Sequence, residues 1–252
     1  MNKLFSASSS KRHAHSSILN DRNFIINDNT AFSIKEEYKT LRTNIMFSIP
    51  SDGCKIIGVS SAEPMEGKSI NCLNLAITFA QINKRVLLID CDLRLPKQAS
   101  LLNLDAIPGI SNVLVGMNTI CEAVQKTSYP DLDVILSGDI PPNPSELLGS
   151  ENMGKILLEL SQSYDYVLVD LPPINIVSDT AAISKYLSAV ILVVRATVSK
   201  RDNVKKAINQ LELAGINIIG IVLNGVISKM GISRKYGKYG HYGKYGYSKT
   251  KE

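Results

Sequence analysis

Six short runs of apolar residues, separated by helical or turn-forming sequence, limit the fold of this chain more than any other feature. They are apolar at consecutive positions, as strands are when both faces of a parallel sheet are covered. The segments between them, such as SINCLNLAITFAQI and KRDNVKKAINQLELAG, have the spacing of amphipathic helices. This alternation predicts a doubly wound α/β fold with a mostly parallel sheet. The runs are KIIGVSS, RVLLIDCD, LDVILSG, YVLVDLP, AVILVVRA and IIGIVLNG.

The length and composition fit one large domain with appendages. The chain has 252 residues, and 44% of them are apolar, which is enough to fill a core. No stretch of about eighteen apolar residues is present to span a bilayer. The Ser-rich start, MNKLFSASSSKRHAHSS, does not have the apolar centre of a signal peptide. We therefore expect a cytoplasmic protein.

Cysteine and histidine usage narrows the possible chemistry. The four cysteines form no close pairs, so we expect reduced thiols rather than disulfides or a metal site. Histidine occurs only near the two ends of the chain, which argues against a Ser-His-Asp, Cys-His or His-based zinc centre in the domain. These residues are Cys54, Cys72, Cys91, Cys121, His13, His15 and His241.

The sequence divides into three parts. Residues 1–30 are predicted to form a mobile arm, residues 31–227 the domain with a first helix at 32–49, and residues 228–252 a disordered tail. The tail has a glycine in almost every triplet, which makes order entropically costly. From Lys229 to Glu252 there are seven Lys or Arg and one acidic residue, whereas the whole chain carries only +5. The basic character therefore belongs to the tail, and the domain is close to neutral.

The first apolar run leads into SSAEPMEGKSI, a candidate phosphate-binding loop. Residues 62–69 fit the pattern G-x-x-x-x-G-K-[ST], with Ala62 in place of the first glycine. In such a loop the backbone N–H groups and a helix N-terminus face the phosphates. Lys68 would reach the β- and γ-phosphates, and the Ser69 hydroxyl would ligate Mg²⁺. The expected nucleotide contacts are Glu63, Pro64, Met65, Glu66, Gly67, Lys68, Ser69 and Ile70.

Acidic residues stand at the ends of two further runs. LLIDCDLR carries Asp90, Asp92 and Arg94, and LVDLPP carries Asp170. Ligands of open α/β sheets bind at the carboxyl ends of the strands, so the loop and these carboxylates predict a Mg-nucleotide site. Each carboxylate alone has a structural alternative: Asp90 or Asp92 could cap the next segment, and Asp170 could begin a turn before Pro172.

Taken together, AEPMEGKS, LLIDCDLR and VLVDLPP, with GDIPPNPSELL between the last two, resemble the bacterial tyrosine kinases of capsule and exopolysaccharide synthesis. The match covers roughly residues 32–226 and the tyrosine-rich tail. It is similar to the stand-alone cytoplasmic form, which works with a separate membrane-spanning activator. The resemblance implies Walker A, Walker A′ and Walker B motifs, ATP and Mg²⁺ as cofactors, and conversion of protein tyrosine to phosphotyrosine.

The resemblance also implies roles for the acidic motifs. Asp90 is expected to accept the phenolic proton, with Asp92 supporting it or the metal. Arg94 is expected to meet the incoming tail or the transferred phosphoryl group, and Asn224, at the end of the last run, is a candidate contact to the base. The expected magnesium ligands are Ser69, Asp90 and Asp170.

The chain departs from the family pattern at two places. The family usually reads P-G-E-G-K, and Met65 stands where that first glycine would be. If this position needs a positive φ, methionine costs about 1–2 kcal/mol. EEYKTLRTNI resembles the E-x-x-R-x-x-R assembly helix through Glu36, Lys39 and Arg42, with lysine as the middle residue. Lysine cannot supply the bidentate fork of arginine, so we expect weaker ring assembly.

Half of the ten tyrosines lie in the last seventeen residues, at Tyr236, Tyr239, Tyr242, Tyr245 and Tyr247. Behind a kinase domain, this flexible tail is expected to be the enzyme's own substrate, phosphorylated between subunits of a homo-oligomeric ring. The other expected partners are the membrane-spanning activator, which would hold the protein at the inner face of the membrane, and polysaccharide-synthesis enzymes as substrates.

Two other functions share some of these features. Septum-site and partition ATPases have the same architecture but carry a signature lysine in K-G-G-x-G-K-[ST], and Glu63 occupies that position here. A nucleic-acid binder could use the basic, tyrosine-rich tail. The nearly neutral domain offers no basic face, so nucleic acid is not an expected partner.

Overall fold

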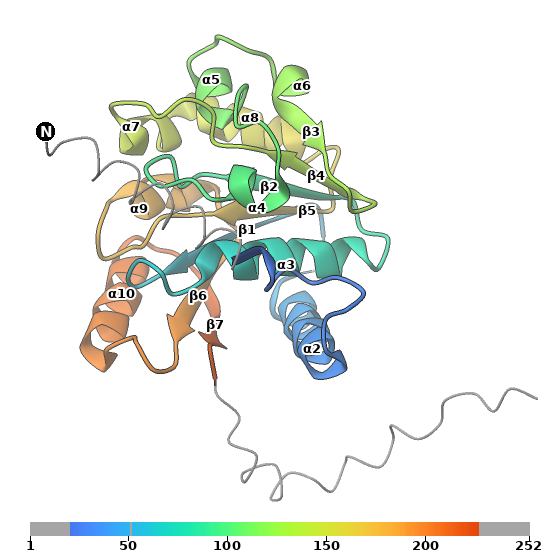
Figure 1. The fold of residues 1–252 in the computed structure, drawn as a ribbon. Coiled ribbons are helices and arrows are strands. Elements are labelled where there is room, and N and C mark those ends of the chain that lie inside the picture. Colours follow the sequence, from blue (N-terminus) through green and yellow to red (C-terminus); the bar gives the residue numbers. More distant parts are fainter. Residues whose placement is uncertain (1–20, 51, 227–252) are drawn as a thin grey trace, which may run out of the picture.

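The computed structural model describes residues 21–50 and 52–226, which form one α/β domain around a seven-stranded sheet (Figure 1). The strand order is β3-β4-β2-β5-β1-β6-β7. Neighbouring strands pair in parallel except β3, which runs antiparallel to β4 at one edge. The strands are β1 (Lys55–Ser61), β2 (Val86–Asp90), β3 (Val124–Lys126), β4 (Leu132–Ile135), β5 (Tyr166–Asp170), β6 (Ala189–Arg195) and β7 (Ile218–Asn224).

The parallel strands coincide with the six apolar runs, which confirms the predicted fold class. Helices connect them, and several shorter ones lie between β2 and β5. The helices are α2 (Phe32–Ser48), α3 (Lys68–Ala80), α4 (Gln98–Leu102), α5 (Ile110–Leu114), α6 (Ile120–Ala123), α7 (Pro144–Leu148), α8 (Glu151–Leu160), α9 (Asp179–Ile183), the 3₁₀-helix η1 (Ser184–Tyr186) and α10 (Arg201–Leu213).

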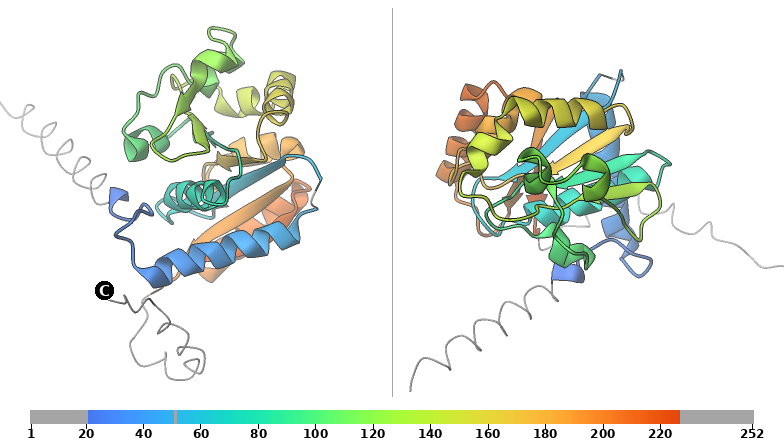
Figure 2. Two further views of the ribbon diagram at one scale, coloured as in Figure 1. Left: turned by 90° about the vertical axis from the view of Figure 1, so that its right-hand side faces the viewer. Right: turned by 90° about the horizontal axis from the view of Figure 1, so that it is seen from above.

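The sheet is covered on both faces because consecutive side chains of its strands point to opposite sides. In β2, Val86 and Leu88 belong to an apolar cluster with α3 and Ile45 of α2. Leu87 and Ile89 belong to a second cluster with α5 and α8. Figures 1 and 2 show the same division, with α2 and α3 on one face and α8 on the other.

Strand β7 differs from the expectation of a fully covered sheet. It pairs with β6 only, and its Ile221 and Leu223 side chains are 51% and 56% exposed. The unbroken apolar sequence of this run therefore reflects an edge strand with one partly open face. Its carboxyl end still lies at the same edge of the sheet as those of β1, β2 and β5, because these strands run parallel.

Part of the predicted N-terminal arm packs against the domain. Ile25 and Ile26 are buried, and the buried Asn74 side chain of α3 makes two hydrogen bonds to the backbone of this segment. Its Oδ1 accepts from the Ile26 N–H at 2.9 Å, and its Nδ2 donates to the Phe24 carbonyl at 2.9 Å. Residues 21–30 are thus attached to α3, while residues 1–20, the other part of the predicted arm, lie outside the described residues.

Among the described residues, no helix combines the length and the apolar character needed to cross a bilayer. The predicted tail and its five tyrosines also lie outside this part of the chain.

Candidate functional site

The predicted phosphate loop connects β1 to α3. Gly67 caps α3 with φ 94°, so the loop turns sharply before the helix begins. Met65 has φ 63°, which confirms that its position requires the left-handed conformation usually given to glycine. The Met65 side chain is 82% exposed and therefore gains little packing in return.

The Glu66 carboxylate shapes the loop from inside. Its Oε2 accepts hydrogen bonds from the backbone N–H groups of Ala62 at 2.9 Å and Glu63 at 3.1 Å. Its Oε1 accepts from the Ser199 hydroxyl, and only 1% of the residue is exposed. Glu66 was predicted as a nucleotide contact. Its side chain is occupied within the loop, which leaves its backbone for that role.

Asn224 lies beside the same loop, as its place at the end of β7 suggested. Its Nδ2 donates to the Glu66 carbonyl at 2.9 Å. A Cβ atom on Gly67 would lie 2.2 Å from that Nδ2, so Gly67 is required both by its φ and by this close approach. The predicted contact between Asn224 and the nucleotide base stays a prediction.

The two acidic motifs meet the loop lysine at the carboxyl edge of the sheet. Asp90 and Asp170 are register partners on the adjacent strands β2 and β5. Lys68 Nζ lies 2.7 Å from Asp92 Oδ2 and 3.2 Å from Asp170 Oδ1. The sequence therefore placed Lys68, Asp90, Asp92 and Asp170 together correctly, and all four are buried.

Burial and mutual repulsion determine the charge state of this cluster. Desolvation, followed by the negative charge of Asp170, raises the pKa of Asp90 to about 7. Burial alone would lower the pKa of Lys68, but the charges of Asp170 and Asp92 raise it above its ordinary value. The lysine therefore stays protonated, while Asp90 can gain or lose a proton near neutral pH.

The loop after β2 wraps around the Asp90 carboxylate. Oδ2 accepts from the backbone N–H groups of Lys97 at 3.1 Å and Gln98 at 2.9 Å, and Oδ1 accepts from the Asp92 N–H at 3.2 Å. Gln98 was not singled out from the sequence. Its fully buried side chain donates to Asp170 Oδ2 and to the Ser69 carbonyl.

Arg94 forms an ion pair within the domain. Its Nε and Nη2 donate to the two carboxylate oxygens of Asp179 at 2.9 and 3.0 Å. Asp179, the first residue of α9, is fully buried and also accepts from the Ser145 hydroxyl of α7. Arg94 therefore joins the loop after β2 to α7 and α9, and its predicted contact with a tail or phosphoryl group is untested.

A chain of hydrogen bonds connects α2 to the phosphate loop. The Tyr38 hydroxyl donates to Asn71 Oδ1 at 2.9 Å, and Asn71 Nδ2 donates to the Gly67 carbonyl at 2.9 Å. Asn74 Nδ2 donates in turn to the Tyr38 oxygen at 3.1 Å. One face of α3, which carries Asn71 and Asn74, therefore contacts α2, the segment before α2 and the phosphate loop.

The three predicted assembly residues on α2 have unequal surroundings. Glu36 and Lys39 form an exposed ion pair of 2.7 Å. Arg42 instead turns toward α3 and donates from Nη1 to the Thr78 carbonyl at 2.7 Å. Arg42 therefore anchors α2 within its own domain, and the other two remain available at the surface.

The site's donor atoms fit a magnesium ion bound with a nucleotide. Mg²⁺ in phosphoryl-transfer sites takes one or two protein oxygens and completes its shell with phosphate and water. Ser69 Oγ and the Asp170 carboxylate supply such oxygens. In residues 21–50 and 52–226, no three acidic, His or Cys side chains are arranged as an all-protein metal site.

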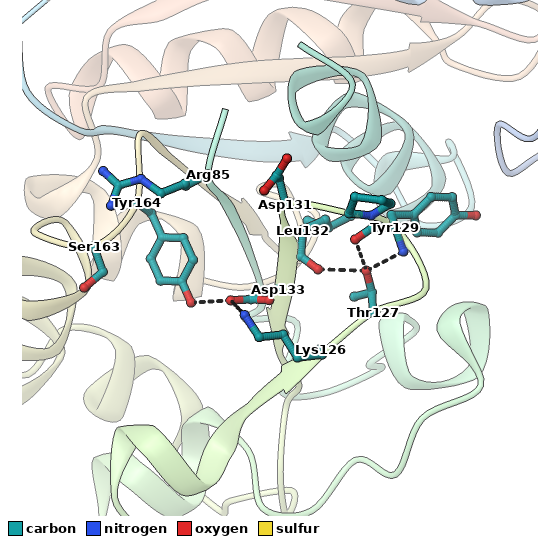
Figure 3. A pocket seen from close by; sticks show the side chains of 10 residues that line it. Arg85, Lys126, Thr127, Tyr129, Asp131, Leu132, Asp133, Ser163 and Tyr164 are labelled. Carbon is teal, nitrogen blue, oxygen red and sulfur yellow. Dashed lines mark hydrogen bonds and ion pairs between the residues drawn. The ribbon is translucent and has the colours of Figure 1, made fainter. Parts of the chain in front are cut away.

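A separate pocket of about 430 Å³ lies at the opposite, amino-terminal edge of β2, β4 and β5 (Figure 3). Its acidic and basic side chains are balanced in number. Asp133 Oδ2 accepts from the Tyr164 hydroxyl at 2.8 Å and pairs with Lys126 Nζ at 2.9 Å. None of the predicted site residues lines it, so this pocket is separate from the predicted nucleotide site.

Known proteins resemble this chain in both sequence and architecture. A family model described as an AAA domain matches residues 54–217. Putative tyrosine-protein kinase CapB of Staphylococcus aureus is 35% identical over 199 residues, which are 79% of this chain and 87% of CapB. The solved kinase domain of Escherichia coli tyrosine kinase ETK matches with a TM-score of 0.78 and 35% identity, over 82% of this chain and 81% of that structure.

The chimerical protein CapA2B2 matches with a TM-score of 0.72 and 37% identity, over 75% of this chain and 83% of that structure. The residues matched by the family model include the loop and both acidic motifs, where the observed geometry brings lysine and carboxylates together. The chain therefore belongs to the family of bacterial tyrosine-protein kinases.

Proposed function

We propose that this tyrosine-protein kinase phosphorylates the tyrosines of its own C-terminal tail, between subunits, and thereby regulates capsule or exopolysaccharide synthesis. The observation that carries the proposal is the convergence of Lys68 with Asp92 and Asp170 beside the phosphate loop. A cation and carboxylates at this edge are the groups that phosphoryl transfer from ATP to a hydroxyl needs.

Nucleotide binding would redirect Lys68. In the structure its ammonium group satisfies two carboxylates, and the phosphates of ATP would compete for it. The loop N–H groups and the α3 N-terminus would hold the phosphates, while Ser69 and Asp170 would hold Mg²⁺. When bound, Mg²⁺ supplies positive charge that offsets the charge developing on the phosphate oxygens.

Asp90 is our candidate for the proton acceptor. The tyrosine oxygen attacks the γ-phosphorus, the bond from that phosphorus to the β,γ-bridging oxygen breaks, and ADP leaves. The phenolic proton goes to the carboxylate, whose raised pKa suits a base at neutral pH. Among the described residues, Asp90 Oδ1 accepts one hydrogen bond, from the Asp92 N–H, so it retains the capacity to accept this proton.

The acceptor would come from residues 236–247. A glycine-rich coil of about 25 residues, the length of the predicted tail, would have an end-to-end dimension of roughly 25–30 Å, which is enough to reach a neighbouring subunit. Each phosphotyrosine adds about −1.5 to −2 of charge, so five of them would reverse the basic charge of the tail. We propose that this reversal loosens a ring built through α2.

The family resemblance supports two further parts of the proposal. One is a separate membrane-spanning activator that holds the kinase at the cytoplasmic face. The other is a set of polysaccharide-synthesis enzymes as additional substrates.

Mixing two variants, one without activity and one without the tail, tests the proposal. One carries Lys68→Met and keeps its tail; the other is active but lacks residues 235–252. We expect anti-phosphotyrosine signal on the Lys68→Met chain only in the mixture with ATP and Mg²⁺. If the Lys68→Met chain is folded and its tail stays unmodified, under conditions where the wild type is phosphorylated, transfer between subunits is refuted.

A further inference from the structure

We infer that Gln98 is a positioning residue of the kinase reaction, which holds the Asp170 carboxylate in the orientation needed for the metal-nucleotide complex. The inference rests on the proposed function. Gln98 is the first residue of α4 and is fully buried at the centre of the site.

One amide group bridges two parts of the site. Gln98 Nε2 donates to Asp170 Oδ2 at 2.8 Å and to the Ser69 carbonyl at 3.0 Å. Ser69 lies in the first turn of α3, and Asp170 ends β5. Both protons of the amide are therefore used to fix the distance between the proposed serine ligand and the proposed acidic ligand.

The two oxygens of Asp170 have different partners. Asp170 Oδ2 accepts a hydrogen bond from Gln98 Nε2, whereas Asp170 Oδ1 lies 3.2 Å from Lys68 Nζ. If Lys68 turns toward the phosphates, Asp170 loses its cation but keeps the Gln98 hydrogen bond. That bond then fixes the carboxylate plane, so that Oδ1 stays directed toward the position the lysine has left.

The oxygen of the Gln98 side-chain amide, Oε1, also indicates that a ligand binds here. Gln98 Oε1 is buried and has no hydrogen-bond partner among the described residues. Exchanging the amide oxygen and nitrogen would place Oε1 against a carboxylate oxygen, so the observed orientation is the favourable one. A buried acceptor is normally paired, and a donor arriving with the bound nucleotide complex would satisfy it.

The backbone of Gln98 makes a different hydrogen bond from its side chain, so the role of the side chain can be tested by substitution. Its N–H donates to Asp90 Oδ2 at 2.9 Å, and this bond does not depend on the side chain. Substitution of Gln98 therefore changes the support of Asp170 and leaves the support of Asp90 in place.

The test variant is Gln98→Met, which keeps the length of the side chain and removes the donor. The matched control is Gln125→Met, at an edge-strand glutamine whose amide donates to the Asp105 carbonyl. Binding of a fluorescent ADP analogue is measured in EDTA and in Mg²⁺. We expect the affinity of Gln98→Met for the ADP analogue to be unchanged in EDTA. The factor by which Mg²⁺ increases this affinity should fall about tenfold, an effect typical of residues that support a metal ligand.

Kinetics supply a second readout. We expect Gln98→Met to need about tenfold more Mg²⁺ for half-maximal phosphorylation, with KM for the tail unchanged. The control should match the wild type in both measurements. If Gln98→Met does not fold, Gln98→Asn withdraws the amide by one methylene and answers the same question.

If Mg²⁺ increases the ADP affinity of Gln98→Met as much as that of the wild type, the inference is overturned. An equal loss of affinity with and without Mg²⁺ would also overturn it, since that result indicates a merely structural role. The proposed function fails separately: a wild-type protein that binds Mg-ADP but never forms phosphotyrosine would refute the kinase reaction and leave the Gln98 measurement intact.

Discussion

Lys68 Nζ lies 2.7 Å from Asp92 Oδ2, so the lysine of the phosphate loop is paired with the second acidic motif inside the protein. The Lys68 side chain is only 10% exposed, and its second partner, Asp170, is fully buried. Lys68 therefore has a structural role in addition to the proposed binding of phosphate.

We expect Lys68→Met to abolish phosphotyrosine formation and also to destabilise the fold. Breaking a buried ion pair by removing one partner costs about 3–5 kcal/mol, because the remaining charges are uncompensated. Urea denaturation measures this loss, and Lys205→Met on the exposed side of α10 is the control. A variant as stable as the wild type would show that the carboxylates do not depend on the lysine.

Met65→Gly should stabilise the protein. Methionine at φ 63° costs about 1–2 kcal/mol, and the greater chain entropy of glycine takes back about 0.5–1 kcal/mol. We expect a net gain of up to about 1 kcal/mol in the free energy of unfolding. Met117→Gly is the matched control, since Met117 is also exposed but has no positive φ. Equal effects of the two substitutions would count against backbone strain at Met65.

Arg94 and Asp179 should show strong energetic coupling. The pair joins a partly exposed guanidinium to a fully buried carboxylate through two hydrogen bonds. In a double-mutant cycle with alanine we expect an interaction energy of about 1–2 kcal/mol. The exposed pair Arg85–Asp165, 3.4 Å apart, should give less than about 1 kcal/mol.

The same cycle tests the role first predicted for Arg94. If Arg94→Ala abolishes phosphoryl transfer while the coupling to Asp179 is negligible, the arginine acts on the substrate rather than on the fold.

The assembly residues of α2 should separate into two groups. Arg42→Ala removes the hydrogen bond to the Thr78 carbonyl and should cost about 1–2 kcal/mol of stability. Glu36→Ala and Lys39→Ala break an exposed pair and should cost less than about 0.5 kcal/mol. Sedimentation of the last two variants therefore reports on assembly alone. A ring that survives both substitutions would exclude this pair from the interface.

Alkylation of the cysteines should depend on burial and pH. Burial raises the pKa of the half-buried Cys54 thiol to about 11, whereas Cys121 is exposed. Only the thiolate reacts, and below its pKa the thiolate fraction rises about tenfold per pH unit. We expect Cys121 to react first at pH 7.5 and Cys54 to accelerate steeply from pH 8 to 10. Mass spectrometry of the Cys121→Ser variant follows Cys54 separately; rapid reaction at pH 7.5 would contradict this expectation.

The sequence predicted the parts of the fold that depend on local pattern. Consecutive apolar residues identified every parallel strand. Lys68, Asp90 and Asp170 come at or just after the ends of such runs, and this position placed them at one edge because the carboxyl ends of parallel strands lie together. Helices of four or five residues, such as α4, are too short to show a periodicity. Strand β3, with three residues and an antiparallel pairing, has no such signal either.

The missed residues depend on tertiary contacts. Gln98 lies eight positions after Asp90, at the start of the short helix α4, and its role appears only when the fold brings it next to Asp170 at the end of β5. Arg42 turns inward because a carbonyl of α3 is within its reach. The apolar pair Ile25–Ile26, within a polar segment, was the one sequence signal that part of the expected arm packs against the domain.

The hydrogen bonds from Tyr38 through Asn71 to Gly67 have a thermodynamic consequence. A partner that binds α2 and shifts Tyr38 also changes the environment of the loop carbonyl, and so changes the affinity for nucleotide by some factor. Linkage requires nucleotide to change the affinity of that partner by the same factor. If α2 is the assembly surface and ATP binds at this loop, as proposed, assembly and ATP binding are coupled, and the sign of the coupling determines whether a subunit joins an assembly with or without nucleotide.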